Sequence, residues 1–535
     1  MADHDLWWQN GVVYQIYPRS FADSNGDGVG DLNGIRQRLD HLVELGVDAI
    51  WLSPIFPSPQ VDFGYDVSDY RAIDPLFGSL EDFDNLLAEA HQRGIRIILD
   101  LVLNHTSSQH PWFLESRRSR DNPKRDWYLW RDAKPNGRPP NNWASVFGGG
   151  GWCWVDERRQ YYFHMFYPQQ PDLNWRNPQV RSEMLSLFNY WCDRGVDGFR
   201  LDVFNAYMKH ADLLDNPPRL GLRVWDRQRH VYDVDQPEML PVLEDIRRIL
   251  DAYPDRYAVG ETFMGGGDLV GEYIRPGRLH GEFDFTLLRA PWNAARFMQA
   301  ILRWEHLNGS ECWPTQVLNN HDNPRSATRY RCGGRDERLK LAAGILLTLR
   351  GTPFLYYGEE IGMRDLSITR AEVQDPIGKR YWPFHRGRDG CRSPMQWDAS
   401  QNAGFSSSQP WLRVHPDFPS RNLEVQRADP NSLYHFYRQL IALRRQLPAL
   451  RRGMFQPVTY SPRRLLAYLR QTSDETLLVV VNFCRQRINL VLGPELSRCG
   501  WELLLSNCRA SLPGRQFATL EVAGEEFLLL RQLQK

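Results

Sequence analysis

Eight short apolar runs alternate with helical patterns along this chain, and no other feature constrains its fold more. The segments between them include the amphipathic stretches LEDFDNLLAEAHQRG (80–94) and DERLKLAAGILLTLRG (336–351). Repeated strand–helix alternation predicts a parallel sheet, and eight repeats are enough to close that sheet into a barrel. We therefore predict an α/β fold, a (β/α)8 TIM barrel, with strands at residues 11–17, 47–53, 95–102, 196–203, 256–262, 281–286, 315–320 and 352–358.

Two stretches depart from the repeat. Residues of about 105–175 follow the third strand and are rich in Trp, Pro, Gly and Asn, which indicates an inserted lobe rather than a crossover helix. After about residue 453 the pattern alternates as in β-strands, for example in RLLAYLRQ and EEFLLLRQ, which predicts an antiparallel C-terminal domain. The expected domains are the barrel (1–104 and 176–452), the inserted domain (105–175) and a C-terminal β-sandwich (453–535).

Composition excludes several classes of partner. Lys+Arg and Asp+Glu are both 65, so the net charge is zero and gives no electrostatic footprint for nucleic acid or an anionic membrane. The chain has no apolar run of about 18 residues, and its first residues, MADHDLWWQN, are charged and aromatic. Its eight cysteines form no C-x-x-C pair, so we expect free thiols in a cytoplasmic protein. The sequence leaves the oligomeric state open and is compatible with a monomer.

Charged side chains follow several of the predicted strands, at the end where barrel proteins gather functional groups. Taken singly, an aspartate there is more often a helix cap or a salt-bridge partner, and a histidine can be a packing residue. Their occurrence at four strand ends of one barrel favours a shared site. The residues are Asp100, Asn104 and His105 at the end of the third strand, Arg200 and Asp202 at the end of the fourth, Glu261 at the end of the fifth, and His321 and Asp322 at the end of the seventh.

The string DSNGDGVGD (23–31) places oxygen-bearing side chains at alternate positions, as a loop around Ca²⁺ or Mg²⁺ does. It opens like an EF-hand, but Gly34 stands at position 12, where that loop requires glutamate. A strand-like segment precedes it and a helical one follows it, so the loop belongs to a strand–helix unit. The alternative is a Gly/Asp-rich turn that holds no ion. The candidate ligands are Asp23, Asn25, Asp27 and Asp31.

The strings DLVLNH (100–105), GFRLDV (198–203), GETF (260–263) and NNHDNPR (319–325) resemble the four signature regions of the α-amylase family, glycoside hydrolase family 13. QPDLNW (170–175), FGYDVSDY (63–70) and GRDGCRSPMQW (387–397) are similar to the α-glucosidase and oligo-1,6-glucosidase branch of that family. The resemblance extends in order from about residue 7 to about residue 400.

The resemblance implies catalytic roles for three carboxylates. Asp202 would be the nucleophile that forms a glucosyl-enzyme, Glu261 the acid and then the base, and Asp322 a group that holds sugar hydroxyls. A retaining mechanism of this kind needs one ionised and one protonated carboxyl group close together. Arg200 lies two residues before Asp202 on an extended strand, so both point to one face and the arginine can hold Asp202 as an anion. We expect crowding by the other carboxylates to raise the pKa of Glu261.

The resemblance also implies a sugar-binding set and a structural ion. Arg392 would pair with Asp62 and close the site into a pocket for a terminal glucose, with Tyr65 as the stacking platform. The sugar-binding set is Asp62, Tyr65, His105, Phe147, Phe166, Arg200, His321 and Arg392. The ion, Ca²⁺ or Mg²⁺, would be held by Asp23, Asn25, Asp27, the Val29 carbonyl and Asp31, away from the reaction, and no catalytic cofactor is implied.

Two cues to the substrate disagree. Within this branch, Val203 after the nucleophile is typical of α-1,6-preferring enzymes, whereas FNAYMKHADLLDNPP (204–218) resembles transglucosylating enzymes, some of them α-1,4-selective. We expect a broad exo-α-glucosidase of small oligosaccharides with an α-1,6 preference and a capacity for transglucosylation. A sucrose isomerase or trehalose synthase on the same scaffold remains an alternative. A non-catalytic scaffold protein is disfavoured, because all three implied catalytic carboxylates are present.

Overall fold

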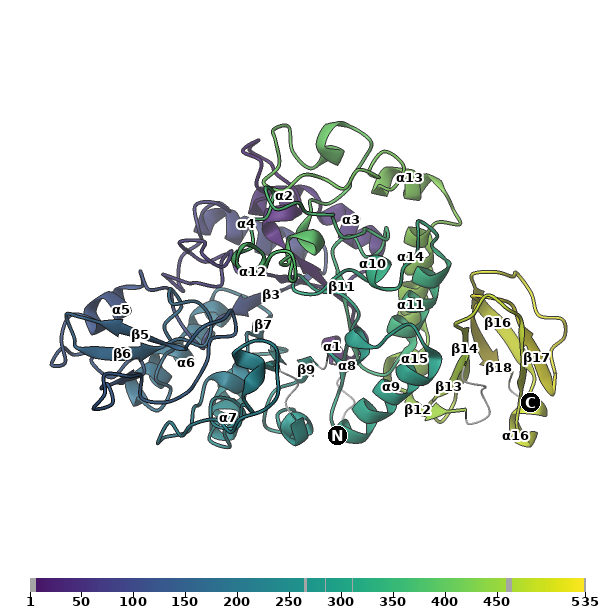
Figure 1. Ribbon diagram of the computed structural model, residues 1–535. Helices are drawn as coiled ribbons and strands as arrows, with labels where there is room; N and C mark the ends of the chain where they lie inside the picture. The colour runs from purple at the N-terminus through teal and green to yellow at the C-terminus, as the bar shows by residue number, and fades with distance from the viewer. Residues whose placement is uncertain (1–5, 264–266, 284, 310, 459–463, 534–535) are drawn as a thin grey trace.

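A computed structural model describes residues 6–263, 267–283, 285–309, 311–458 and 464–533 (Figure 1). Its centre is a sheet of eight parallel strands in the order β10-β11-β1-β2-β3-β7-β8-β9. A hydrogen bond from the Thr315 hydroxyl to the Glu282 carbonyl joins the two end strands, which brings the barrel close to closure. The strands are β1 (Val13–Ile16), β2 (Ala49–Leu52), β3 (Arg96–Leu101), β7 (Gly198–Leu201), β8 (Tyr257–Glu261), β9 (Gly281–Phe283), β10 (Thr315–Val317) and β11 (Thr352–Tyr356).

All eight strands lie within the ranges predicted from the sequence, so the barrel prediction is confirmed. The strands are almost entirely buried on both faces, which is why they read as continuous apolar runs. The α-helices are α1 (Trp7–Asn10), α2 (Leu32–Gln37), α3 (Leu39–Leu45), α4 (Leu80–Gln92), α5 (Pro111–Ser116), α6 (Pro178–Asp193), α7 (Met239–Leu250), α8 (Thr286–Arg289), α9 (Ala294–Asn308), α10 (Ser326–Arg329), α11 (Glu337–Thr348), α12 (Pro376–Tyr381), α13 (Leu423–Ala428), α14 (Leu433–Gln446), α15 (Pro448–Arg452) and α16 (Pro494–Ser497).

Local sequence explains where the principal helices begin. Ser79 and Asp82 form a reciprocal capping box at the start of α4, and Asn177 caps α6 directly before a proline at its first position. Asp31, at the end of the Gly/Asp-rich loop, accepts from the Gly34 N–H and so caps α2. The loop is therefore anchored to the helix that follows β1.

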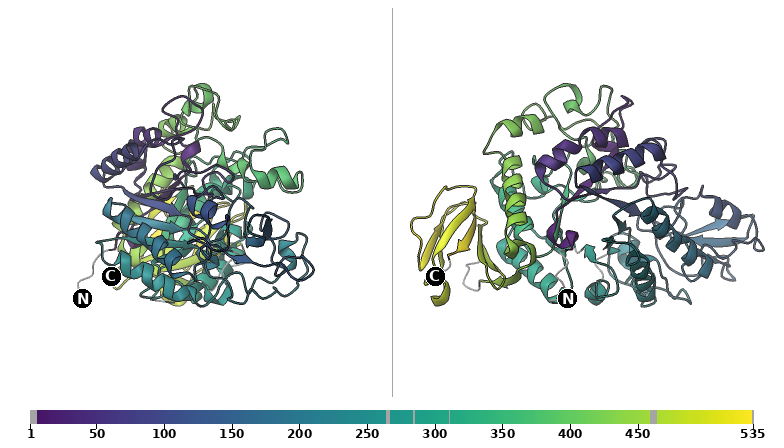
Figure 2. Two further views of the ribbon diagram at one scale, coloured as in Figure 1. Left: turned by 90° about the vertical axis from the view of Figure 1, so that its left-hand side faces the viewer. Right: turned by 180° about the vertical axis from the view of Figure 1, so that it is seen from behind.

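The predicted lobe and C-terminal domain lie at opposite ends of the molecule (Figures 1 and 2). Between β3 and β7 the chain forms a small sheet in the order β4-β6-β5, from β4 (Trp130–Arg131), β5 (Trp152–Val155) and β6 (Gln160–Phe163). The C-terminal region has an antiparallel sheet of order β12-β13-β14-β18-β16 and a separate β15–β17 pair. Those strands are β12 (Met454–Pro457), β13 (Leu465–Gln471), β14 (Thr476–Asn482), β15 (Ile488–Val491), β16 (Trp501–Ser506), β17 (Thr519–Val522) and β18 (Phe527–Gln532).

Side chains from both C-terminal sheets, among them Leu490 and Leu520 from one and Val480 and Leu528 from the other, share one apolar cluster. This packing agrees with the expected β-sandwich, while the domain boundaries drawn from the sequence remain predictions. Helix α11 packs between the barrel and this domain, and a Cβ at Gly344 would meet the Phe527 ring at 2.3 Å. All eight cysteines are free, as expected. In the part of the chain that the structure describes, no helix has the length and apolar character needed to cross a membrane.

Candidate active site

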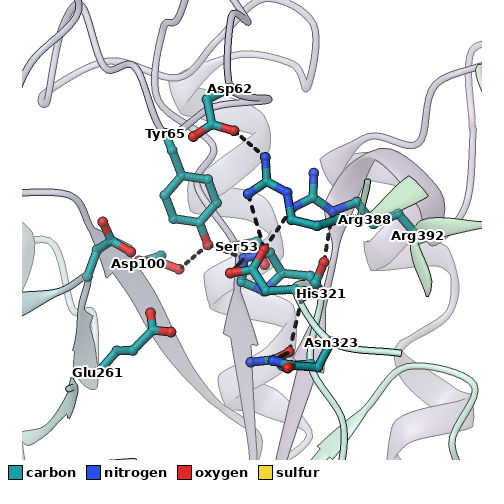
Figure 3. A network of polar contacts seen from close by, with 12 residues as sticks. Ser53, Asp62, Tyr65, Asp100, Glu261, His321, Asn323, Arg388 and Arg392 are labelled. Atoms are coloured by element: carbon teal, nitrogen blue, oxygen red, sulfur yellow. Dashed lines mark hydrogen bonds and ion pairs between the residues drawn. The ribbon is translucent and has the colours of Figure 1, made fainter. Parts of the chain in front are cut away.

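The carboxyl ends of the barrel strands bring the predicted side chains together (Figure 3). Asp100 and Arg200 are direct neighbours in the register of β3 and β7, and Glu261 ends the adjacent strand β8. Asp202 directly follows β7, and Asp322 lies in the connection that follows β10. The spacing of the strands, rather than any local sequence motif, therefore sets the distances between these groups.

Arg200 contacts three carboxylates at once. Its Nη1 donates to Asp100 Oδ1 at 2.7 Å and to Asp202 Oδ1 at 2.8 Å, and its Nη2 pairs with Glu261. Burial raises the pKa of Asp202 to about 6, although Arg200 opposes this rise. Burial likewise raises the pKa of Asp100, again against the pull of Arg200. The expected pairing of Arg200 with Asp202 is present, and the same guanidinium also contacts Asp100 and Glu261.

His321 is held as a neutral ring in a defined orientation. The Gln15 side-chain nitrogen lies 2.8 Å from its Nδ1, and the Tyr65 hydroxyl lies 2.7 Å from its Nε2 and 3.1 Å from Asp100 Oδ2. Because the amide of Gln15 donates, Nδ1 must accept and Nε2 carries the proton toward Tyr65, which in turn donates to Asp100. Burial lowers the pKa of His321 to about 3, so the ring is uncharged at neutral pH. The Tyr65 and His321 rings are stacked with their centres 5.4 Å apart.

Asp322 lies between two guanidinium groups. Arg392 Nη2 donates to Asp322 Oδ1 at 2.8 Å, and Arg388 Nη1 approaches the same oxygen at 3.3 Å. Burial acts to raise the pKa of Asp322, but His321 and the two arginines outweigh it, so the pKa is lowered. Since His321 is neutral near pH 7, the arginines hold this carboxylate ionised.

The predicted pairing of Arg392 with Asp62 is wrong. Asp62 Oδ1 accepts from Arg388 Nη2 at 2.6 Å, whereas Arg392 donates through Nε to the His321 carbonyl at 2.8 Å and through Nη2 to Asp322 (Figure 3). The two arginines flank a 3₁₀ turn at Asp389–Arg392, which directs them to different carboxylates. Asp375, the cap of α12, fixes Arg388 by accepting from its Nε at 2.9 Å.

The inserted lobe supplies the opposite wall. His105 Nε2 lies 2.9 Å from the Tyr65 carbonyl, and its ring is 5.2 Å from that of Phe166. Phe147 lies 5.7 Å from Phe166, and the Arg388 guanidinium sits 5.5 Å from the Phe147 ring centre. Both phenylalanines thus stand where the sequence placed them.

These groups surround a cavity of about 410 Å³. Eight of the predicted residues line it, while Arg200, His321 and Arg392 lie behind the lining and hold it in place. Sequence reasoning missed Gln170, although this residue belongs to the quoted string QPDLNW. Its side-chain amide donates to Asp62 Oδ2 at 3.3 Å. The other lining residues that it did not assign to the site are Val146, Val203, Arg223, Trp225, Thr262, Phe263, Phe285, Arg289, Asn323 and Arg388.

The oxygens of the 23–31 loop accept mainly from its own backbone. Asp23 accepts from the N–H groups of Gly26 and Gly28 at 2.7 and 2.8 Å, and Asp31 accepts from Ser24 and Gly34. These bonds curl the loop, and each carboxylate keeps lone pairs beyond them. Among the described residues, no group of three or more His, Cys, Asp or Glu is placed to hold a metal ion, so the ion at this loop remains a prediction.

Comparison with known proteins gives consistent matches over nearly the whole chain. The family model described as the catalytic domain of alpha amylase matches residues 15–453, and the maltogenic amylase C-terminal domain matches 455–529. A probable alpha-glucosidase of Rhizobium meliloti is 45% identical over 89% of both chains. An oligo-1,6-glucosidase of Parageobacillus thermoglucosidasius is 40% identical over 94% of this chain and 95% of its own.

Two solved structures are similar in fold and sequence. The alpha-glucosyl transfer enzyme XgtA superimposes with a TM-score of 0.93 at 41% identity, covering 99% of this chain and all of its own. The trehalulose synthase MutB of Pseudomonas mesoacidophila superimposes with a TM-score of 0.90 at 35% identity, covering 98% and 99%.

Proposed function

The chain belongs to the α-amylase family of glycoside hydrolases, and from this membership we propose that it is an exo-acting, retaining α-glucosidase. It releases terminal glucose from small α-glucosides through a covalent glucosyl-enzyme, accepts several linkages with a preference for α-1,6, and also transfers glucose to acceptors. The α-glucosidase and oligo-1,6-glucosidase relatives support the hydrolase, and the similar glucosyl transfer enzyme supports the transfer reaction.

Asp202 attacks the anomeric carbon while Glu261 protonates the departing glycosidic oxygen. Both carboxyl groups face Arg200, and this shared contact suits the exchange of charge between them. As Asp202 loses its charge by forming the ester, Glu261 gains one by giving up its proton. The charge that this pair of carboxyl groups presents to the guanidinium therefore stays at one negative charge, so little electrostatic reorganisation accompanies the step.

The Asp62–Arg388 pair is the observation that carries the exo assignment. It bonds at 2.6 Å beside Phe147 at the end of the cavity remote from Glu261, where a longer chain would have to continue (Figure 3). Asp62 and Asp322, with the neutral His321 behind them, present acceptors and a donor network to sugar hydroxyls. A terminal glucose fits such a closed end, whereas an internal residue of a chain does not.

We assign the 23–31 loop a structural Ca²⁺ or Mg²⁺, held by Asp23, Asn25, Asp27, the Val29 carbonyl and Asp31. Hard oxygen ligands on a curled loop suit these ions, which would stiffen the connection between β1 and α2. The catalytic steps proposed above use no metal. The eight free cysteines support a reducing compartment such as the cytoplasm.

A substrate panel tests the proposal. The purified protein is incubated with maltose, isomaltose, sucrose, trehalose and p-nitrophenyl α-glucoside, and the products are separated by chromatography. We expect glucose from each cleaved substrate, fastest from isomaltose. Conversion of sucrose into an isomeric disaccharide would instead place the protein with the trehalulose synthase, and no turnover of any substrate would contradict the proposal.

The linkage preference has a test of its own at Val203, which lines the cavity next to Asp202. Replacement by alanine should lower the ratio of isomaltose to maltose hydrolysis by roughly tenfold, the scale of one or two methyl groups in an apolar pocket. An unchanged ratio would show that Val203 does not determine the linkage preference.

A further inference from the structure

Two residues beside Asp62 have a backbone conformation that their side chains disfavour. Gln60 and Phe63 have φ angles of 62° and 50°, in the left-handed region that favours glycine. Because neither residue is glycine, this conformation is strained, and it persists only where the surrounding structure imposes it. The turn that carries Asp62 therefore needs a group that holds it in place.

Arg19 contacts both strained residues. Its Nη2 donates to Gln60 Oε1 at 2.8 Å, and its guanidinium carbon lies 5.2 Å from the centre of the Phe63 ring. This arginine comes from the 3₁₀ turn Pro18–Ser20 that follows β1, whereas Asp62 belongs to the connection after β2. One side chain of the first connection thus contacts the residues on both sides of Asp62 in the second.

Trp411 keeps Arg19 in a defined position. The centre of its ring lies 5.0 Å from the guanidinium carbon and 5.5 Å from the centre of the Phe63 ring. The Trp411 backbone N–H donates to the Gly28 carbonyl at 2.9 Å, and its indole N–H donates to the Ser20 hydroxyl at 3.0 Å. The guanidinium and the two aromatic rings therefore form one cluster of cation–π contacts on a fixed support.

The burial of Arg19 is costly. The residue is 8% exposed, and its Nε is buried without a hydrogen-bond partner among the described residues. Burial lowers the pKa of Arg19, and the attraction of Asp74 does not cancel this effect. Gln60 Nε2 donates to Asp74 Oδ2 at 2.7 Å, so the amide of Gln60 links the arginine to that carboxylate. A buried cation that contacts aromatic rings and an amide indicates a role beyond fold stability.

The backbone between the two strained residues has a separate support. The Asp66 carboxylate accepts from the N–H groups of Val61 and Asp62, both at 3.0 Å. Asp66 therefore sets the path of the turn, while Arg19 acts on the side chains that flank it. Loss of the Arg19 contacts should then loosen Asp62 against Arg388 rather than unfold the turn.

We propose that Arg19 is a positioning residue, which holds the turn from Gln60 to Phe63 so that Asp62 faces Arg388 at the closed end of the cavity. Arg19 is not among the residues that line the cavity, so it acts on the terminal glucose through Asp62, which bonds Arg388 at 2.6 Å. This inference rests on the α-glucosidase proposed above, in which Asp62 binds hydroxyls of that glucose.

The test replaces Arg19 by methionine, which keeps a flexible side chain without the charge. KM for maltose should rise roughly tenfold while kcat changes little, because Asp62 holds hydroxyls remote from the reacting bond in the ground state and the transition state alike. The dissociation constant of glucose, measured by titration calorimetry, should rise by a similar factor. Arg19→Lys keeps a cation near Phe63 and should recover part of the loss.

Arg38→Met is the matched control. Arg38 also packs on a tryptophan, with its guanidinium carbon 4.4 Å from the centre of the Trp397 ring, but its hydrogen bond goes to the Gly404 carbonyl. Burial lowers the pKa of Arg38 as it does that of Arg19. The control should therefore lose a similar contact and leave KM and the glucose dissociation constant unchanged.

A double-mutant cycle separates positioning from stability. In an Asp62→Asn background, Arg19→Met should have almost no further effect on either constant, because the group through which it acts is already lost. Full additivity, or unchanged constants in Arg19→Met itself, would overturn the inference while leaving the α-glucosidase intact. Failure of the unaltered protein to release glucose from maltose would instead contradict the proposed function.

A second variant keeps the test decisive if Arg19→Met does not fold. Gln60→Gly keeps the left-handed backbone, which glycine adopts freely, and removes the side chain that Arg19 contacts. The dissociation constant of glucose should then rise by about threefold, the scale of one hydrogen bond between uncharged and charged groups acting at a distance from the ligand. An unchanged constant in Gln60→Gly would overturn the inference equally.

Discussion

At the inner end of the cavity carboxylates meet guanidinium groups, whereas beside its mouth apolar side chains stand in water. Asp62 and Asp322 are joined through Arg388, and Arg200 binds Asp100 and Asp202. Beside the mouth, on the segment that leads to the lining residue Arg223, Leu220 and Leu222 have almost no cover. The two ends of one cavity are thus built from different interactions.

A site built in this way can be selective at one end and permissive at the other. Buried charges are costly unless their partners are fixed, so the inner end has one arrangement, which suits the terminal glucose of the proposed reaction. Apolar contact is not directional, so an apolar mouth suits the several linkages that we propose. The predictions below act on these two ends, beginning with the largest expected effect.

Replacing Asp202 by asparagine should lower kcat/KM by roughly 10⁴-fold, because the amide removes the attacking oxygen anion while keeping the shape. Steady-state hydrolysis of p-nitrophenyl α-glucoside measures it. Asp212→Asn, an exposed aspartate in the following loop, is the control and should retain full activity. Near-normal activity in the Asp202 variant would remove this residue as the nucleophile.

Replacing Arg388 by methionine should lower kcat/KM for maltose by roughly a hundredfold, since it leaves Asp62 and Asp375 buried without their shared cation. The variant should also gain relative activity on chains blocked at the non-reducing end, because the closed end is opened. Arg386→Met, two residues away and exposed, is the matched control. If Arg388→Met stays strictly exo-acting, the Asp62–Arg388 pair does not define the closed end.

Activity should fall below about pH 6. Burial raises the pKa of Asp202 to about 6, so below that value the carboxyl is protonated and cannot attack. The pKa of Asp322 is lowered, so this residue stays ionised over the same range. The profile of kcat/KM against pH should drop about tenfold per unit on its acid side. An acid limb near pH 4 would show that the cavity does not shift Asp202 in this way.

Removing the proposed ion should affect stability more than catalysis. EDTA should lower the melting temperature by roughly 2–5 °C while leaving hydrolysis at 25 °C nearly unchanged, because the loop lies outside the cavity. Added Ca²⁺ should restore the melting temperature, and Asp27→Ala should abolish the response. Immediate and complete loss of activity on chelation would contradict a structural role.

The sequence was sufficient for the barrel because eight strands buried on both faces leave eight apolar runs. It was also sufficient for the residues at the ends of those strands, since the fold brings strand ends together regardless of loop details. It failed for Arg388 and Arg392, which lie four positions apart on either side of a short turn. Which arginine reaches Asp62 depends on the path of that turn and on Asp375. Neither the path nor the role of Asp375 can be recognised from the sequence.

The mouth of the cavity was the least predictable region, because its residues also depend on the path of connecting segments. Trp225 and Phe285 come from separate connections after the strands, whose course is set by packing rather than by local pattern. Gln170 and Phe263 differ, because they belong to strings already singled out and could have been assigned to the site. The exposure of Leu220 and Leu222 has no counterpart in the sequence, where no pattern distinguishes these two leucines from buried ones.

The stereochemistry of the first product distinguishes a covalent glucosyl-enzyme from direct attack by water. Proton NMR spectra recorded within the first minutes of isomaltose hydrolysis distinguish α- from β-glucose before the anomers equilibrate. A retaining exo-α-glucosidase that uses Asp202 and Glu261 in succession must release α-glucose first, with β-glucose appearing only by mutarotation. Initial release of β-glucose would mean direct attack by water and would contradict the covalent glucosyl-enzyme on which the account rests.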